Sequence, residues 1–348
     1  MSQHKASITN SPQAALLEWC RLIMPGMLLA LVLAMASKFV AASYGGPTML
    51  FALLFGMAFN FLAKDDKCAP GIALASKTIL RLGVALLGVQ LTLGDLTALG
   101  APVVLLVTLG VVVTISVGWA LGRALKLPTS LAVLSAGAVA ICGASAALAI
   151  SAVLPRGDSR ERNVVLVVAG VTALSTLAMI FYPPLAHYIG LSERYAGIFF
   201  GATIHDVAQV IGAGYAVSDM AGETAAIVKL MRVAMLVPAV LFIGLMFKKD
   251  RCAVDADAKT PLLPMFLIGF VVLVLINSFG YVPSLAVEGL TEASRWCLVT
   301  AVAALGIKTN LGEVFSVGPR PLLAMVAQTI LLMIFSLIGI RYLGGYLG

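Results

Sequence analysis

Charged residues are scarce in this sequence. Asp, Glu, Lys and Arg make up 11% of its 348 residues, whereas 61% are hydrophobic, and the mean hydropathy is +1.04. A soluble domain carries about 25% charged residues, so the composition excludes that class. Apolar runs near the ~20 residues needed to cross a bilayer recur along the chain. We therefore expect an all-α polytopic membrane protein.

Signatures of several other protein classes are also missing. The five cysteines are scattered without a CxxC pair, so we expect neither a disulfide framework nor a metal site. No GxxxxGK[ST] phosphate loop is present, so this chain is not expected to use ATP, and no cofactor is expected. The net charge of +7 fits basic cytoplasmic loops better than binding to nucleic acid.

Residues 1–19 are polar and lack the apolar core and the small-residue cleavage site of a signal peptide. We expect a polar tail over 1–19, followed by a single membrane domain over 20–348. Insertion would then use the first membrane helix. We place the N-terminus in the cytoplasm and the protein in the plasma (inner) membrane.

Charged or Gly/Pro-rich punctuation divides the chain into eleven apolar segments. They lie near 20–37, 47–63, 76–94, 103–122, 130–154, 163–186, 195–217, 224–247, 262–280, 293–311 and 319–343. If all eleven crossed the membrane, most basic loops would lie inside, but the loop PRGDSRER (155–162) would lie outside. That placement conflicts with the positive-inside rule.

An internal repeat bears on this conflict. LGVQLTLGDLTALG (87–100) aligns with LGIKTNLGEVFSVG (305–318), with three glycines in register and Asp95 opposite Glu313. PTMLFALLFGMAFN (47–60) similarly resembles PMFLIGFVVLVLINS (264–278). Segments two to four thus match nine to eleven, an odd offset that predicts opposite orientation. We expect inverted halves over about 47–186 and 195–343.

The fifth and seventh segments are both rich in small residues and interrupted near the middle. They contain SAGAVAICGASAALAIS (135–151) and FFGATIHDVAQVIGAGYAVS (199–218). If each is a re-entrant hairpin, the two become inverted relative to each other, and loop 155–162 moves inside. The prediction is nine spanning helices plus two re-entrant hairpins, a plan typical of secondary transporters. Two unwound helices that cross fully, giving eleven segments, remain the alternative.

The stretch ICGAS contains Cys142, Gly143, Ala144 and Ser145. If the chain unwinds here, the next half-helix begins with free N–H groups, which attract an anion. These residues are therefore candidates for substrate binding. The alternative is ordinary helix packing through small residues.

In GATIHDVAQV, Thr203, Asp206 and Gln209 are three residues apart and would share one helical face. His205 adjoins that face. Ionisable groups within a membrane segment usually serve a function, and histidine titrates near physiological pH. We expect His205 and Asp206 to relay a proton, and Thr203 and Gln209 to bind substrate. Helix capping by Asp206 is the structural alternative.

Lys229 and Arg232 also share a helical face. They either line the binding cavity and counter an anion, which makes them candidate substrate-binding residues, or they extend to the interface. Lys77 and Arg81 fit the second description better. Gln90 and Lys308 are equivalent in the repeat and rank lower as candidates.

These motifs resemble the YeiH-type family of bacterial membrane proteins, which are described as sulfate-exporter candidates. The resemblance runs from about residue 45 to the C-terminus. It is carried by RLGVALLGVQLTLGDL (81–96), ICGASAA (141–147), GATIHDVAQV (201–210), VKLMRVAMLVP (228–238) and AALGIKTN (303–310). It implies the superfamily of bile-acid symporters and cation/proton antiporters, in which a panel domain packs beside a core with discontinuous helices.

The leading hypothesis is a secondary active transporter, an exporter of a small anion such as sulfate, a sulfonate or another oxyanion. A proton or a cation is the candidate coupling ion, the lipid bilayer is its surroundings, and a homodimer is an option. We do not expect an enzyme. Two alternatives stay open: an intramembrane hydrolase with Ser145 as nucleophile and His205 as base, and a passive anion channel. The segment GASAA lacks the second glycine of GxSxG, which weighs against the hydrolase.

Overall fold

The computed structural model describes residues 12–44, 47–92, 94, 99–155, 160–247, 265–309 and 319–344. Every regular element within these ranges is helical. The first bundle contains α1 (Pro12–Tyr44), α2 (Thr48–Ala58), α3 (Ala69–Leu74), α4 (Leu80–Leu87), α14 (Met265–Ser278) and α15 (Ser284–Lys308). The second contains α6 (Gly100–Ala124), α7 (Thr129–Ala140), α8 (Ala144–Val153), α9 (Arg160–Tyr188), α10 (Glu193–Thr203), α11 (Val207–Tyr215), α12 (Asp219–Ala234), α13 (Leu236–Met246) and α16 (Pro319–Gly344).

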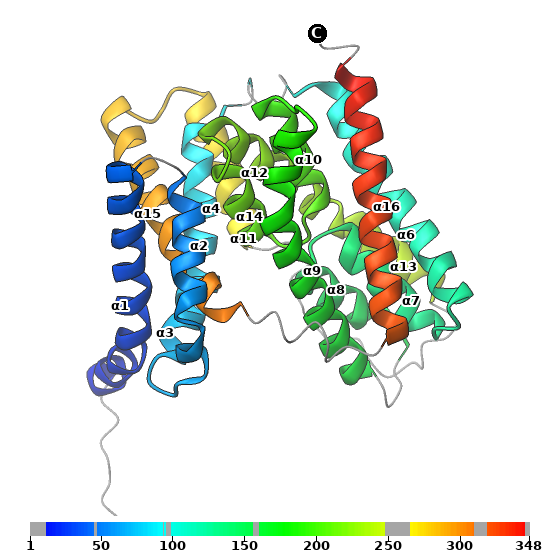
Figure 1. Cartoon of the computed structure of the whole chain (residues 1–348), viewed down its shortest axis with the longest axis horizontal. Coiled ribbons are helices and arrows are strands. Elements are labelled where there is room, and N and C mark those ends of the chain that lie inside the picture. The colour runs from blue at the N-terminus through cyan, green and yellow to red at the C-terminus, as the bar shows by residue number, and fades with distance from the viewer. Residues whose placement is uncertain are drawn as a thin grey trace, which may run out of the picture.

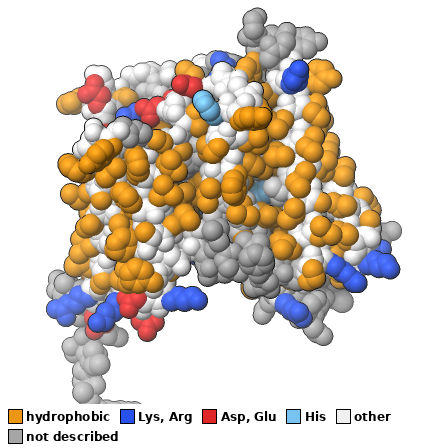
Figure 2. Space-filling view, viewed as in Figure 1, with side chains coloured by type: hydrophobic (Ala, Val, Ile, Leu, Met, Phe, Trp, Pro, Cys, Tyr) orange, Lys and Arg blue, Asp and Glu red, His pale blue; other side chains and the backbone are white. Residues whose placement is uncertain are grey.

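Seven helical stretches among the described residues are long and apolar enough to cross a membrane. Apolar side chains form a broad band across the face shown in Figure 2, and Lys and Arg side chains gather along the lower edge of that face. The all-α polytopic fold class is therefore confirmed. Helices α2 and α14 contain 11 and 14 residues, shorter than the other spans. The predicted crossings at these two helices stay predictions.

The first helix begins earlier than the sequence suggested. Helix α1 starts at Pro12, inside the stretch predicted as a polar tail, and its apolar span runs from Glu18 to Tyr44. Proline near a helix start is favourable because its missing N–H would have no intrahelical partner there. Residues 1–11 of the predicted tail lie outside the described residues.

The two groups of helices stand side by side (Figure 1). We call the group of α1–α4, α14 and α15 the flanking bundle, and the group of α6–α13 and α16 the hairpin bundle. Helix α11 of the hairpin bundle packs against α2 and α15 of the flanking bundle. The interface between the bundles therefore runs along α11.

Three short helical turns extend or connect the helices of the flanking bundle. The 3-10 turn Asn60–Lys64 follows α2, the π-helical turn Ala75–Ile79 joins α3 to α4, and the 3-10 turn Gly88–Gln90 follows α4. The apolar span from Ala69 to Gln90 is continuous through the second and third of these turns.

Glycines set the closest helix crossings in the flanking bundle. A Cβ on Gly306 of α15 would collide with the carbonyl of Leu53 in α2, and a Cβ on Gly88 would collide with that of Phe270 in α14. In the predicted repeat, Gly88 matches Gly306 and Leu53 matches Phe270. The same crossing thus occurs twice, between repeat-equivalent residues.

Two asparagines make a further pair of contacts between repeat-equivalent residues. The Asn60 amide donates to the carbonyls of Ile307, at 2.7 Å, and Thr309, at 2.9 Å. The Asn277 amide donates to the Leu91 carbonyl at 3.3 Å. Asn60 matches Asn277 in the alignment, and Leu91 matches Thr309. These paired contacts support the inverted repeat, which stays a prediction, since Asp95 and residues 310–318 lie outside the described residues.

Helices α7 and α8 fold back on each other. Gly137 of α7 faces the side chain of Ile150 in α8, and Ser130 lies beside Leu154 around one small cavity. The ends of the pair that are far from its turn therefore lie together. They are close to Arg160, at the start of α9.

Helices α10 and α11 form a second pair of this kind. Gly197, early in α10, and Gly214, late in α11, both pack against Ala221 of α12. The open end of this pair lies near the end of α9, because only residues 189–192 separate α9 from α10. The two hairpins thus open toward opposite ends of α9. Their entry into a bilayer from opposite sides stays a prediction.

We expect Gly306→Ala to separate α2 from α15, because the added Cβ has no space beside the Leu53 carbonyl. Overpacking of this kind costs about 1–3 kcal/mol, so the unfolding temperature in detergent should fall by several degrees. The control is Gly289→Ala, on the same helix, where no atom lies within 4 Å of the new Cβ. An equal effect of both substitutions on the unfolding temperature would contradict the assigned crossing.

Candidate functional site

The turns of the two hairpins meet beside the middle of α9. Gly143 has φ +60°, a conformation that favours glycine, and it is the N-cap residue of α8. A Cβ there would lie 3.4 Å from Val171 of α9 and 3.8 Å from His205 in the other turn. Asp206 begins α11, and its backbone N–H donates to Ser175 Oγ of α9 at 3.0 Å. Four helix ends therefore converge at one point.

Lys229 of α12 is fully buried at this point, with 0% of its surface exposed. Its ammonium donates to the carbonyls of Ile141 at 2.7 Å, Ile204 at 2.9 Å and His205 at 2.6 Å. An ammonium has three donors. All three are used, and they tie one turn to the other.

Arg232 lies one helical turn further along α12 and is 1% exposed. Nε and Nη2 donate to the Ala140 carbonyl, Nη2 also donates to that of Val139, and Nη1 donates to those of Gly201 and Ile204, all at 2.9–3.1 Å. These five bonds equal the donor capacity of a guanidinium. The two cations thus neutralise the carbonyl ends of α7 and α10, where the helix dipoles are negative.

The amide ends of α8 and α11 are in a different situation. Ser145 in the first turn of α8 is exposed, and Ala144, Asp206 and Val207 are partly exposed. The first N–H groups of a helix have no intrahelical acceptor. Positive helix ends therefore lie at an accessible surface, while the negative ends are buried and neutralised.

His205 points away from that surface. Its ring is fully buried, with Nδ1 3.1 Å from the Val139 carbonyl and Nε2 3.0 Å from Thr329 Oγ1 of α16. The Thr329 hydroxyl also lies 2.8 Å from the Met325 carbonyl, to which it can donate. A doubly protonated ring can donate to both acceptors. A neutral ring that donates from Nδ1 needs the Thr329 hydroxyl to turn toward Nε2.

Gln209 is fully buried on α11, and its amide donates to Thr176 Oγ1 of α9 at 3.0 Å. The single proton of Thr176 is directed to the Thr172 carbonyl, so Thr176 accepts from Gln209. The Gln209 Oε1 atom is buried and has no hydrogen-bond partner among the described residues. This acceptor lies on the helix that Asp206 begins.

The carboxyl group of Asp206 interacts electrostatically with cations from both bundles. Lys229 is the strongest of these, and Lys308 and Arg81 of the flanking bundle also contribute. Arg81 and Lys308 are exposed side chains. Asp206 is thus within range of positive charge from both bundles.

The structure brings most of the predicted site residues together, although their contacts differ from expectation. Cys142 is buried in the first turn, and Thr203 is buried and donates to the carbonyl of Phe199 in its own helix. His205 contacts α7 and α16, whereas the backbone of Asp206 contacts α9. The predicted relay between these two residues stays a prediction. Direct binding of substrate by Lys229 or Arg232 would require their present hydrogen bonds to break.

Residues that the sequence did not single out also contribute. Ser175, Thr176 and Thr329 supply hydroxyls to the residues of the second turn. Hydroxyl side chains in apolar helices usually bond to their own backbone, so their sequence positions gave no signal. Arg81 and Lys308 were ranked low because they lie near segment ends.

Comparison with known proteins bears on the origin of this arrangement. A family model described as "Conserved hypothetical protein 698" matches residues 25–325. The chain belongs to this family. Its relatives carry the name UPF0324 membrane protein, and the predicted resemblance to the YeiH-type family is confirmed. No solved structure matches the chain.

Three UPF0324 relatives illustrate the similarity. The protein of Chlorobaculum tepidum is 51% identical over 90% of this chain and 88% of its own length. One from Rhizobium meliloti is 48% identical over 92% of this chain and 93% of its own. The protein named TauZ of Paracoccus denitrificans is also 48% identical, over 92% of this chain and 95% of its own. The similarity to UPF0324 proteins thus includes both hairpins and α12.

We expect Lys229→Met to destabilise the protein strongly, because it leaves the buried carbonyls of Ile141 and His205 without this donor and removes one of the two donors to Ile204. Each unpaired acceptor costs about 1–3 kcal/mol, so the unfolding temperature in detergent should fall by about 10 °C or more. Lys77→Met removes an exposed lysine and is the matched control. A Lys229→Met protein as stable as the control would refute the neutralising role.

Proposed function

We propose that this protein is a secondary active transporter of a small anion. The observation that carries the proposal is the asymmetry at the hairpin turns. Lys229 and Arg232 bind the carbonyl ends of α7 and α10, whereas the amide ends of α8 and α11 stay accessible. Helix amide ends are suited to binding anions.

The arrangement of the helices supports this function. Broken helices that meet near the middle of a membrane domain are typical of secondary transporters, where they form the substrate site. Unpaired backbone within a membrane is tolerated only against protein or a water-filled cavity. The turns at 141–143 and 204–206 meet the first condition, since buried cations cover one side of them. The partly exposed residues on the other side are where the proposal places the water-accessible substrate site.

The proposed substrate is an oxyanion such as sulfate or a sulfonate. The backbone N–H groups and the hydroxyl of Ser145 at the start of α8 would donate to its oxygens, and Gly143 permits close approach of the backbone. Export from the cytoplasm is the direction that the family resemblance implies. The basic side chains along the lower edge in Figure 2 favour that face as the cytoplasmic one.

Asp206 would couple transport to a proton. A carboxylate at the start of α11 repels an anion bound beside it, so protonation of Asp206 favours anion binding. By linkage, the anion favours protonation to the same degree. His205 and its Thr329 partner would exchange the proton with the turn, since their hydrogen bonds depend on the protonation of the ring.

The hydrolase alternative is less well supported. It needs His205 to accept a proton from Ser145, but the two ring nitrogens face Val139 and Thr329. Ser145 is exposed at the start of α8. The geometry therefore favours binding of an anion over nucleophilic catalysis.

We expect Asp206→Asn to uncouple transport from the pH gradient, because the amide carries no titratable proton. In proteoliposomes loaded with radiolabelled sulfate or ethanesulfonate, a pH gradient should accelerate wild-type flux several-fold. The Asn variant should retain saturable exchange but lose this acceleration. Asp66→Asn, at an exposed aspartate, is the control.

Two results would count against the proposal. Equal acceleration in the wild type and the Asp206→Asn variant would exclude Asp206 as the coupling residue. Flux that neither saturates nor shows counterflow would favour the passive channel over a transporter.

A further inference from the structure

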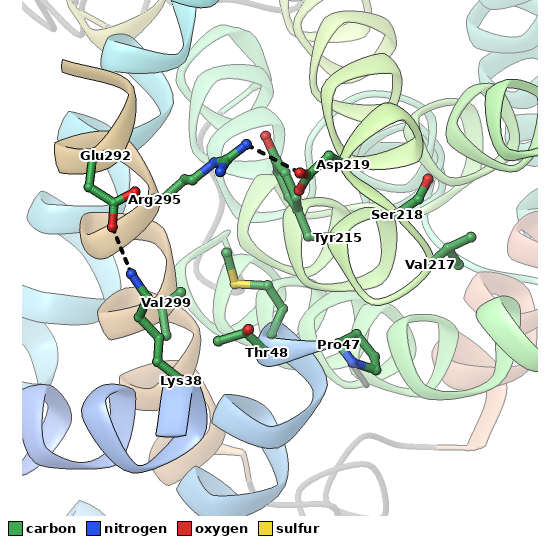
Figure 3. A pocket seen from close by; sticks show the side chains of 11 residues that line it. Lys38, Pro47, Thr48, Tyr215, Val217, Ser218, Asp219, Glu292, Arg295 and Val299 are labelled. Carbon is green, nitrogen blue, oxygen red and sulfur yellow. Dashed lines mark hydrogen bonds and ion pairs between the residues drawn. The ribbon is translucent and has the colours of Figure 1, made fainter. Parts of the chain in front are cut away.

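A cavity of about 520 Å³ lies between the two bundles, away from the hairpin turns. It is at the end of the molecule where α2 and α12 begin and α11 ends (Figure 3). Four charged side chains line it: Lys38, Asp219, Glu292 and Arg295. Pockets that hold small organic ligands have volumes of roughly 300–1,000 Å³. The cavity is therefore large enough for a small organic anion.

The charged residues form two ion pairs of different kinds. Lys38 and Glu292 are 2.7 Å apart and join α1 to α15 within the flanking bundle. Arg295 Nη2 and Asp219 Oδ2 are 3.2 Å apart and join α15 to α12, across the two bundles (Figure 3). The second pair thus joins the two bundles beside the end of α11.

The pairing of Arg295 uses little of its capacity. One donor reaches Asp219, while Nε is buried without a hydrogen-bond partner among the described residues. A guanidinium can offer two parallel donors to an oxyanion, and that geometry is stronger than a single contact. The ammonium of Lys38 is less available to a ligand, because it lies 2.7 Å from Glu292 and 4.1 Å from the centre of the Trp296 ring.

The pair between the bundles is also weak enough to exchange. The side chains of Arg295 and Asp219 are 42% and 66% exposed. Exposed ion pairs contribute about 0–1 kcal/mol, so an oxyanion that binds Arg295 through two donors can replace Asp219 at low cost. Replacement would remove the ion pair between α12 and α15.

We propose that this cavity is an exit site for the transported anion, at the end of the molecule opposite the basic edge, in which the anion's sulfonate or sulfate group replaces Asp219 on Arg295. Binding of the anion and release of the ion pair between the bundles are then one event. The proposal rests on the proposed transport function and assigns it a second, peripheral binding site. Arg295 is the recognition residue, and Asp219 is its internal competitor.

The test measures binding of ethanesulfonate and sulfate to the purified full-length chain in detergent, by titration calorimetry at constant ionic strength. Arg295→Gln should weaken binding about tenfold or more. Arg295→Lys should weaken it less, because the charge remains but the two parallel donors are lost. Asp219→Asn should tighten binding about threefold or more, since the competing charge is gone. Glu288→Gln, at an exposed position on the same helix, should match the wild type.

The opposite signs separate a binding site from a structural ion pair. If the pair only held the bundles together, Arg295→Gln and Asp219→Asn would change binding in the same direction, and the proposal would fall. Wild-type affinity in Arg295→Gln, or no binding of either anion to the wild type, would also overturn it. Flux in proteoliposomes is measured separately. Absent flux with opposite signs in binding would reject the transport function and retain the site.

Discussion

The structure depends on two buried cations that bind backbone rather than carboxylates. Lys229 and Arg232 make eight hydrogen bonds to carbonyls in the two hairpin turns and at the ends of α7 and α10. Burying two positive charges is costly unless their donors are satisfied. Leaving broken helix ends inside a membrane protein is costly for the same reason. Each group compensates the other, and α12 thereby holds both turns in one place.

As a result, the carbonyl ends and the amide ends of the broken helices have different surroundings. The carbonyl ends of α7 and α10 are covered by α12, so the amide ends of α8 and α11 are the parts of the turns left for a ligand. Asp206 and Ser145 lie on that side, whereas His205 extends between α7 and α16. In the proposed function, such a site would recognise an anion by backbone geometry, and its side chains would be left for coupling.

The two bundles are held together more loosely than the turns are. Helix α11 provides the packed contact, and the exposed pair of Arg295 and Asp219 spans the cavity at one end of it. Within the flanking bundle, by contrast, Gly56 and Gly306 bring two backbones into direct contact. A change in structure would therefore more easily move one bundle against the other than rearrange either bundle internally.

The sequence by itself determined the membrane class, the family and the helix breaks near Gly143 and Asp206. It also indicated which residues of the two halves are equivalent in the predicted repeat. Hydropathy, glycine content and residue spacing are local properties, so a linear reading recovers them. Only the tertiary structure decided what each polar side chain does. The spacing of Lys229 and Arg232 suited a substrate site equally well, but their donors are taken by carbonyls from segments that are 24 to 93 residues away in the chain. Arg295 and Asp219 gave no signal, because an ion pair between bundles exists only once α11 is packed against the flanking bundle and brings α12 near α15.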